Sequence, residues 1–255
     1  MRLSQSVIVW KFRFSPESQA ELRTMAGESL SAQERDRAGR FHFERDRCWY
    51  SFFHEATRYL LSSVLPGKPN PASIQFEASA HGKPFLKDFP DWEVNLTHSS
   101  GEAALAVSNC CPVGIDLEEL DQQFPAVEVA REFFIGEEIA WLEAADSAEI
   151  RTNRFFQLWT AKEAAMKFTG LGMTLEPRMI EISIDSNLEK LIGFKHVEGF
   201  PHAQAAWRVH QLECGPDAKL TLVCPVDSDR IQFHDLSNVP PAEWLSRFAD
   251  QEPPK

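Results

Sequence analysis

The chain has 255 residues, of which 43% are hydrophobic and 25% charged, and its formal net charge is −12. This composition is typical of a soluble globular protein, and the apolar runs are too short to span a membrane. The excess of acids argues against general nucleic-acid binding, which needs a basic face to neutralise phosphates. We therefore expect neither nucleic acid nor a membrane among its partners.

Cysteine content and the amino terminus indicate the compartment. Five cysteines, an odd number without metal-like spacing, do not fit a disulfide framework or a zinc cluster. The adjacent Cys110 and Cys111 are interpreted as small buried hydrophobic residues at a strand end. The first residues, MRLSQSVIVWKF, contain a short apolar run without a cleavage site, so we interpret them as a strand rather than a signal peptide. These features predict a cytoplasmic protein.

Strand and helix patterns alternate in the first part of the chain. A strand over residues 7–14 precedes a helix from Pro16, for which Ser15 is a suitable N-cap. A longer helical pattern covers residues 44–65 and ends at the proline-rich segment PGKPNPAS. Short strands are predicted over residues 74–77, 93–96 and 103–108, and an extended segment over residues 112–118.

The pattern becomes helical after Leu120 and then returns to strands. Helices are predicted over residues 127–134, 137–145 and 149–168, the last one ending before Gly170. Strands follow over residues 181–184, 205–212 and 220–223, and PPAEWLSRFAD predicts a short terminal helix. The order of elements predicts an α+β fold of two halves, residues 1–113 and 114–255.

The segment GIDLEEL, from Gly114 to Leu120, alternates apolar and acidic residues. On a strand, Ile115 and Leu117 face the core while Asp116 and Glu118 face the other way together, about 6.6 Å apart along the strand. Two carboxylates in this arrangement can bind one Mg²⁺, which completes its coordination with water and phosphate oxygens. The alternative is a solvent-facing strand edge, because short acidic patterns arise by chance.

The segment WTAKEAAMKF, from Trp159 to Phe168, predicts a helix on which Glu163 and Lys167 share one face. Taken alone, this spacing is typical of an exposed ion pair. Together with Asp116 and Glu118, however, Glu163 provides a third carboxylate for a metal, and Lys167 provides a cation for phosphate. This combination of residues is typical of phosphoryl transfer.

These motifs, in this order and at this separation, resemble those of the Sfp-type 4'-phosphopantetheinyl transferase family. GIDLE and WTAKEAAMK resemble its two signature motifs, HGKPFL resembles its G-K-P segment, and NLTHSS resembles its N-[IL]-S-H-S segment. Upstream, RFHFERDRCWY and HEATRYLL are similar to its amino-terminal helix region. The resemblance covers residues 31–172, and four ordered motifs are far more specific than any one of them.

The resemblance implies a fold, a reaction and a set of roles. Two similar α+β halves, related by a pseudo-twofold axis, would bind coenzyme A in the cleft between them, in a protein that we expect to be a monomer. A serine of an apo acyl or peptidyl carrier protein would attack the β-phosphate of coenzyme A and release 3',5'-ADP. The implied roles are Mg²⁺ ligands for Asp116, Glu118 and Glu163, catalytic base for Glu163, phosphate contacts for Lys167 and His98, a nucleotide or pyrophosphate contact for Lys83, and the 3'-phosphate contact for Arg37.

Two residues depart from the family pattern. Thr97 stands where the family usually has serine, and it keeps a hydroxyl for a contact with the ligand. Glu34 lies where some members have lysine, which leaves Arg37, Arg40 and Arg45 as competing candidates for the 3'-phosphate. Arg58, on the helical pattern over residues 44–65, is a weaker candidate that could reach the cleft or pair with Glu55.

Two other functions use the same residues. A Mg²⁺-dependent nucleotide pyrophosphohydrolase would direct water rather than a serine at the phosphate. A non-catalytic module for coenzyme A or carrier proteins would not need all three carboxylates, so the intact acidic trio favours an enzyme.

Overall fold

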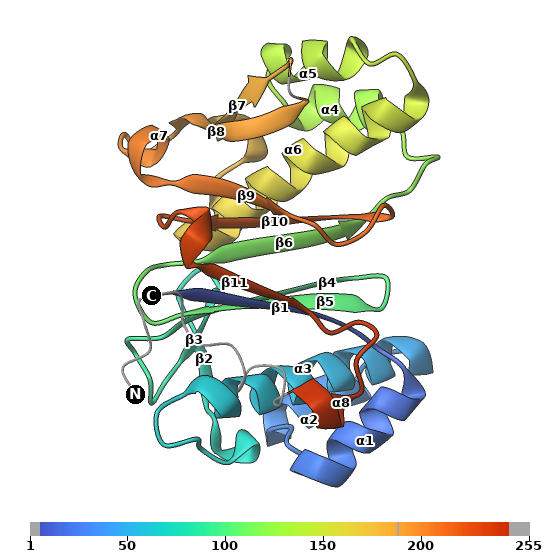
Figure 1. The fold of residues 1–255 in the computed structure, drawn as a ribbon, viewed down its shortest axis with the longest axis vertical. Helices are drawn as coiled ribbons and strands as arrows, with labels where there is room; N and C mark the ends of the chain where they lie inside the picture. Colours follow the sequence, from blue (N-terminus) through green and yellow to red (C-terminus); the bar gives the residue numbers. More distant parts are fainter. Residues whose placement is uncertain (1–5, 188, 245–255) are drawn as a thin grey trace.

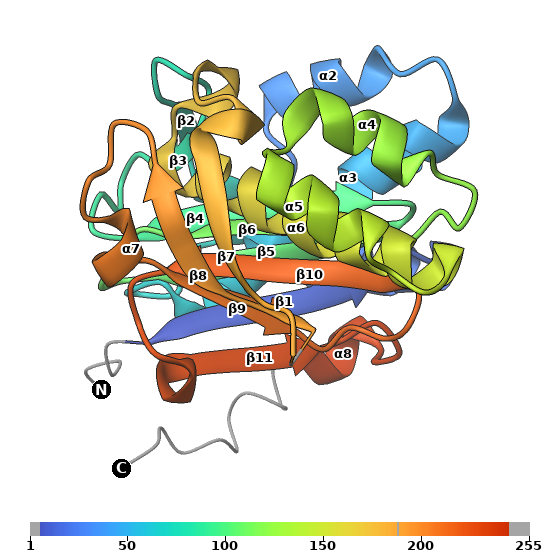
Figure 2. The same ribbon diagram turned by 90° about the horizontal axis from the view of Figure 1, so that it is seen from above.

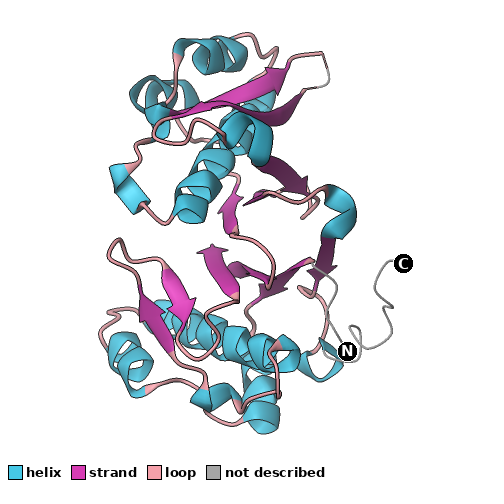
Figure 3. Ribbon diagram, turned by 90° about the vertical axis from the view of Figure 1, so that its left-hand side faces the viewer, coloured by secondary structure: helices cyan, strands magenta, loops and turns pink. Residues whose placement is uncertain are grey.

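The protein consists of two similar halves with helices at the outside and sheets in the middle (Figures 1 and 3). The structure is a computed structural model and describes residues 6–187 and 189–244. None of the helices within these ranges is both long and apolar enough to cross a bilayer.

The first half contains three α-helices and five of its own strands. In chain order these elements are β1 (Val7–Arg13), α1 (Pro16–Ala26), α2 (Ala32–Gly39), α3 (Glu44–Val64), β2 (Phe76–Ala78), β3 (Pro84–Leu86), β4 (Glu93–Ser99) and β5 (Glu102–Ser108). Ser15 accepts a hydrogen bond from the backbone of Ser18 and caps α1, as the sequence predicts.

The second half repeats this order. Its elements are β6 (Gly114–Glu119), α4 (Ala126–Phe133), α5 (Gly136–Glu143), α6 (Ala148–Thr169), β7 (Ile180–Asp185), β8 (Lys190–Val197), α7 (Ala203–Ala206), β9 (Arg208–Leu212) and β10 (Ala218–Cys224). Gly170 ends α6 in a left-handed conformation, which glycine adopts without steric cost. Two differences from the sequence prediction are the short helix α7, where a strand was expected from residue 205, and strand β8, which was not predicted.

Sheet topology shows how closely the halves correspond. The larger sheets have the orders β1-β5-β4 and β6-β10-β9, with antiparallel neighbours, and each half adds a separate hairpin, β2-β3 or β7-β8. Figure 2 shows the β7-β8 hairpin beside α5 and α6. This correspondence confirms the predicted α+β fold of two similar halves.

Three apolar clusters hold the layers together. One surrounds α3 and includes Phe12 of β1, and a second surrounds α6 and includes Phe194 of β8. The third lies between the two larger sheets, where Val9 and Ala106 of the first sheet belong to the same cluster as Ile115 and Leu222 of the second. The buried interface between the sheets thus fixes how the two halves lie on one another.

The end of the described chain returns to the first half. Strand β11 (Ile231–Asp235) pairs in parallel with β1, and α8 (Pro241–Trp244) places Trp244 in the cluster around α3. The boundary predicted between residues 113 and 114 lies in the connection from β5 to β6, and we propose that residues 231–244 belong structurally to the first half. The rest of the predicted terminal helix lies outside the described residues.

Candidate functional site

The two halves meet where the edge strand β4 of the first sheet runs beside the edge strand β6 of the second. Three β4 side chains accept hydrogen bonds from alternate backbone N–H groups of β6: Asn95 from Ile115 (2.8 Å), Thr97 from Leu117 (3.3 Å) and Ser99 from Glu119 (3.3 Å). Side chains thus take the place of a neighbouring strand along this edge of β6. At the same junction β6 provides Asp116 and Glu118, and α6 provides Glu163 and Lys167.

Asp116 is buried at this junction and carries the strongest contacts of the site. Its Oδ1 accepts hydrogen bonds from the Thr97 hydroxyl at 3.2 Å and from the Lys167 ammonium at 2.5 Å. Its Oδ2 is also buried but has no hydrogen-bond partner in the described part of the chain. Burial raises the pKa of Asp116 despite the opposing effect of Lys167. The alternative interpretation was that the acids lie on a solvent-facing strand edge. Asp116 is only 3% exposed, so this interpretation is wrong for Asp116.

Glu118 and Glu163 share the electrostatic environment of Asp116. Burial and the negative charge of Asp116 raise the pKa of Glu118 to about 7, although the Ser99 hydroxyl donates a hydrogen bond to its Oε2 at 3.1 Å. Burial and the same negative charge also raise the pKa of Glu163. Because each carboxylate is destabilised in its charged form, the three together favour a positive partner.

The residues fit a hard divalent cation in donor type and in charge. Such an ion would stabilise three carboxylates that repel one another. It would also provide a partner for the buried Oδ2 of Asp116, which has none among the described residues. In residues 6–187 and 189–244, however, no three His, Cys, Asp or Glu side chains are gathered closely enough to hold a metal. Lys167 provides the positive charge beside Asp116 in this structure, so ion binding requires side-chain rearrangement.

Lys167 and Glu163 do not form the exposed ion pair that their spacing alone suggests. The Lys167 ammonium contacts Asp116 of β6 and the Thr97 hydroxyl of β4, the latter at 3.2 Å. The Thr97 hydroxyl therefore donates to Asp116 and accepts from both Lys167 and the Leu117 backbone. Because these contacts use its donor and both acceptor positions, the structure gives Thr97 the task of orienting the acid and the lysine.

His98, a predicted phosphate contact, lies within electrostatic range of Lys167. The His98 ring stacks on Phe53 of α3, with centroids 5.5 Å apart. Partial desolvation lowers the pKa of His98, and the positive charges of Lys167, His54 and Arg37 lower it further. The positive charges of Lys167 and Arg37 thus both act at His98, and a positive potential there would attract phosphates.

Arg37 is exposed on α2, with its guanidinium 5.5 Å from the centre of the Tyr50 ring. It borders a surface hollow of about 510 Å³, together with Arg40. Within the described residues Arg37 has no carboxylate partner, whereas Arg40 pairs with Asp36 and Arg45 with Asp46. Of the three competing arginines, Arg37 is therefore the one most free to bind an anion.

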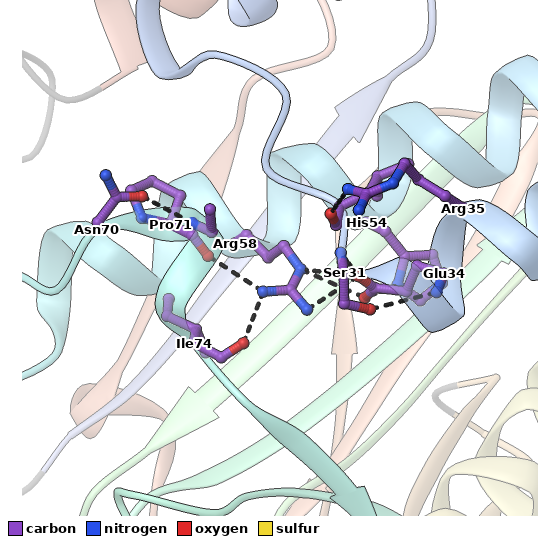
Figure 4. A network of polar contacts seen from close by, with 10 residues as sticks. Ser31, Glu34, Arg35, His54, Arg58, Asn70, Pro71 and Ile74 are labelled. Carbon is purple, nitrogen blue, oxygen red and sulfur yellow. Dashed lines mark hydrogen bonds and ion pairs between the residues drawn. The ribbon is translucent and has the colours of Figure 1, made fainter.

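The Glu34 carboxylate has a structural role that explains its departure from the family pattern (Figure 4). It completes a capping box with Ser31 at the start of α2 and contacts His54 at 3.1 Å and the buried Arg58 at 2.8 Å. These hydrogen bonds and charges outweigh burial and lower the pKa of Glu34 to about 2. Arg58 also donates to the Ile74 carbonyl, at 2.6 Å, so it connects α2 to the loop after α3.

Lys83 lies in the turn between β2 and β3, but its ammonium reaches the junction. It donates to the carbonyls of Val113 (3.3 Å) and Phe168 (3.2 Å) and pairs with Glu93 of β4 (3.1 Å). Its side chain is only 16% exposed. The structure therefore shows Lys83 bound to the carboxyl end of α6 and to the connection between the halves, and its predicted ligand contact stays a prediction.

Lys162, the neighbour of Glu163, is fully buried in a separate network. It pairs with the buried Glu138 of α5 at 2.9 Å and donates to the carbonyls of Pro177 and Ile180. Glu138 in turn accepts from the backbone N–H of Ile182 at 3.0 Å. Lys162 thus fastens α6 to α5 and β7 on one side, while Glu163 and Lys167 point to the junction with β4.

Sequence reasoning missed the roles of Asn95 and Ser99. The alternation in NLTHS would have indicated that Asn95, Thr97 and Ser99 share one face of a strand while His98 faces the other way. The contacts of that face are made with β6, which follows 20 residues later in the chain, and a local sequence pattern does not identify such a partner strand.

Comparisons with known proteins agree with this site. A family model described as the 4'-phosphopantetheinyl transferase superfamily matches residues 112–223. The 4'-phosphopantetheinyl transferase HetI of Nostoc sp. is 36% identical over 177 residues, covering 67% of this chain and 71% of the relative. A putative 4'-phosphopantetheinyl transferase of Synechocystis sp. is 27% identical over 221 residues, covering 84% and 87%. The 4'-phosphopantetheinyl transferase Sfp of Bacillus subtilis is 31% identical over 153 residues, covering 57% and 62%. The chain belongs to the 4'-phosphopantetheinyl transferase superfamily, whose members transfer a 4'-phosphopantetheine group to carrier proteins.

Proposed function

We propose that this transferase takes its phosphopantetheine arm from coenzyme A, with Mg²⁺ as cofactor, and passes it to a serine of an apo acyl or peptidyl carrier protein. The products are the holo carrier and 3',5'-ADP. The observation that carries this proposal is the group of three carboxylates with raised pKa values beside the ammonium of Lys167. A pyrophosphate substrate suits this site, because the three carboxylates would bind a cation that neutralises it and the Lys167 ammonium would contact its phosphate oxygens.

We propose that Asp116, Glu118 and Glu163 bind the Mg²⁺. The Oδ2 of Asp116, which no described residue contacts by a hydrogen bond, supports this role, as do the raised pKa values of all three groups. When bound, the ion would neutralise charge on the pyrophosphate and on the departing nucleotide. The Thr97 and Ser99 hydroxyls would keep Asp116 and Glu118 oriented toward it.

Glu163 is the proposed base for the carrier serine. Its raised pKa supports this role, because a base is most effective when its pKa lies near the working pH. Glu163 would take the hydroxyl proton while the serine oxygen bonds to the β-phosphorus of coenzyme A. The bond from that phosphorus to the oxygen bridging to the α-phosphate breaks, and 3',5'-ADP leaves with the electron pair.

Three side chains would hold the substrate. Lys167 and His98 are proposed to contact the phosphates, and Arg37 the 3'-phosphate. The positive field around His98 and the free guanidinium of Arg37 support this arrangement. Because β4 supplies His98 while β6 and α6 supply the acids, one chain contributes both sides of the site, which supports a monomeric enzyme. The five free cysteines support a cytoplasmic location.

Intact mass spectrometry of the carrier tests the proposal. The protein is incubated with coenzyme A, Mg²⁺ and an apo carrier, with and without a chelator. We expect the carrier mass to increase by one phosphopantetheine group only when Mg²⁺ is present. Free phosphopantetheine without a modified carrier would instead identify a pyrophosphohydrolase, and an unchanged mass with bound coenzyme A would identify a binding module.

Site variants tie the activity to the proposed residues. Glu163→Gln and Asp116→Asn should abolish most of the mass increase. Glu119→Gln is the matched control, because Glu119 is an exposed acid on the same strand as Asp116. Equal activity of Glu163→Gln and the control would contradict the assignment.

A further inference from the structure

Cys110 and Cys111 lie next to one another in the connection from β5 to β6, which joins the two halves. Their sulfur atoms are 3.8 Å apart. Cys110 is exposed and Cys111 half-buried, so the prediction that both are buried is wrong. Two thiols in contact, one of them open to solvent, can react together with one reagent.

The Ser108 hydroxyl holds this arrangement. It lies 3.4 Å from each sulfur, and the backbone N–H groups of Cys110 and Cys111 both donate to it at 3.2 Å. The turn therefore keeps both side chains on the same side of the backbone. The transfer reaction as proposed above makes no use of this pair.

We propose that Cys110 and Cys111 are a dithiol modification site, at which a low-molecular-weight disulfide such as oxidised glutathione closes a disulfide between the two adjacent residues. First, the Cys110 thiolate attacks the glutathione disulfide, forms a mixed disulfide and releases one glutathione thiolate. The Cys111 thiol then loses its proton to solvent, and its sulfur displaces the second glutathione thiolate. Glutathione disulfide is reduced to two thiols while the two cysteines are oxidised.

The order of attack follows from the surroundings of the two sulfurs. Burial raises the pKa of the Cys111 thiol to about 11, which leaves little thiolate to begin the exchange. Exposure of Cys110 makes it the accessible sulfur. Once the mixed disulfide has formed on Cys110, the neighbouring sulfur is held beside it, which compensates for its low thiolate fraction.

The resulting bond is expected to be readily reversible. Adjacent α-carbons across a trans peptide are about 3.8 Å apart, less than the usual separation of about 4.4–6.8 Å across a disulfide. Strained and exposed disulfides are the more easily reduced ones. We therefore expect dithiothreitol to restore both thiols quickly.

Peptide mapping tests the site in the full-length protein. The reduced protein is treated with oxidised glutathione, quenched in acid, unfolded, alkylated and digested. The peptide that contains Cys110 and Cys111 should be unalkylated and lighter by two hydrogen atoms, while Cys48, a half-buried cysteine elsewhere on the chain, should be alkylated. Dithiothreitol before alkylation should return the doubly alkylated peptide.

Two variants separate the steps. Cys111→Ser should stop at a stable glutathione adduct on Cys110, and Cys110→Ser should leave Cys111 largely unmodified. The proposal is overturned if the treated parent protein keeps both thiols, retains the adduct on Cys110, or connects Cys111 to Cys224. Cys224 is the relevant competitor because it is close enough for the charges of Cys110 and Cys111 to raise the pKa of its thiol.

Discussion

Replacing Lys83 by methionine should destabilise the protein in the absence of any ligand. Methionine keeps the apolar part of the side chain but removes the ammonium that contacts the Val113 and Phe168 carbonyls. Hydrogen bonds to a charged group contribute about 1.5–3 kcal/mol each, but these two are long and share one donor, so we expect a loss of about 2 kcal/mol in total. The pair with Glu93, whose side chain is 40% exposed, adds little.

A loss of this size should lower the melting temperature by about 4–8 °C for a chain of this length. The assay is a thermal melt without coenzyme A, together with the KM for coenzyme A. Lys87→Met is the matched control, because Lys87 is exposed and pairs with Glu77 within the same hairpin. An unchanged melting temperature combined with a greatly increased KM would refute the structural role and support the ligand contact predicted from the sequence.

Three further outcomes are expected. Glu163→Gln should slow carrier modification by roughly a hundredfold or more at an unchanged melting temperature, since glutamine cannot accept the serine proton; activity within about twofold of the parent would contradict its role as base. Arg37→Ala should weaken binding of coenzyme A by about tenfold, but not that of 3'-dephospho-coenzyme A, as measured by calorimetry; equal losses would assign the 3'-phosphate to another residue. Because the pKa of Glu118 is raised from 4.5 to about 7, the folded state binds more protons than the unfolded state between these values. Stability without Mg²⁺ should therefore fall as pH rises through this range, and added Mg²⁺ should raise the melting temperature more at pH ~7.5 than at pH ~5.5. A pH-independent effect of Mg²⁺ would contradict its binding to Glu118.

The acids of the site could be predicted from the sequence because they follow from local periodicity. Alternation along GIDLE places Asp116 and Glu118 on one face, and helical spacing places Glu163 and Lys167 on another. In the structure Asp116 pairs with Lys167, so the predicted association of the two motifs is confirmed at that contact. The metal-binding and catalytic roles themselves stay predictions.

The partners of Lys83 and Lys162 could not be predicted because they depend on long-range contacts. Burying Lys162 is possible only because Glu138 is 2.9 Å away, and nothing in the helical pattern indicates that α5 lies there. Strand β11 was missed for a related reason. Its five residues, IQFHD, alternate apolar and polar side chains over only a short run, and they form a strand by pairing with β1, more than 200 residues earlier.

The side-chain contacts between β4 and β6 also affect how the protein avoids aggregation. Both strands lie at the edge of a sheet, and an open edge offers unpaired backbone groups to strands of other chains. Asn95, Thr97 and Ser99 occupy the N–H groups of β6 that face this edge. Replacing all three with alanine would remove the hydroxyls that orient Asp116 and Glu118, so we expect the variant to lose activity. It would also leave the N–H groups of β6 open to a strand of another chain, so we expect the variant to aggregate during expression.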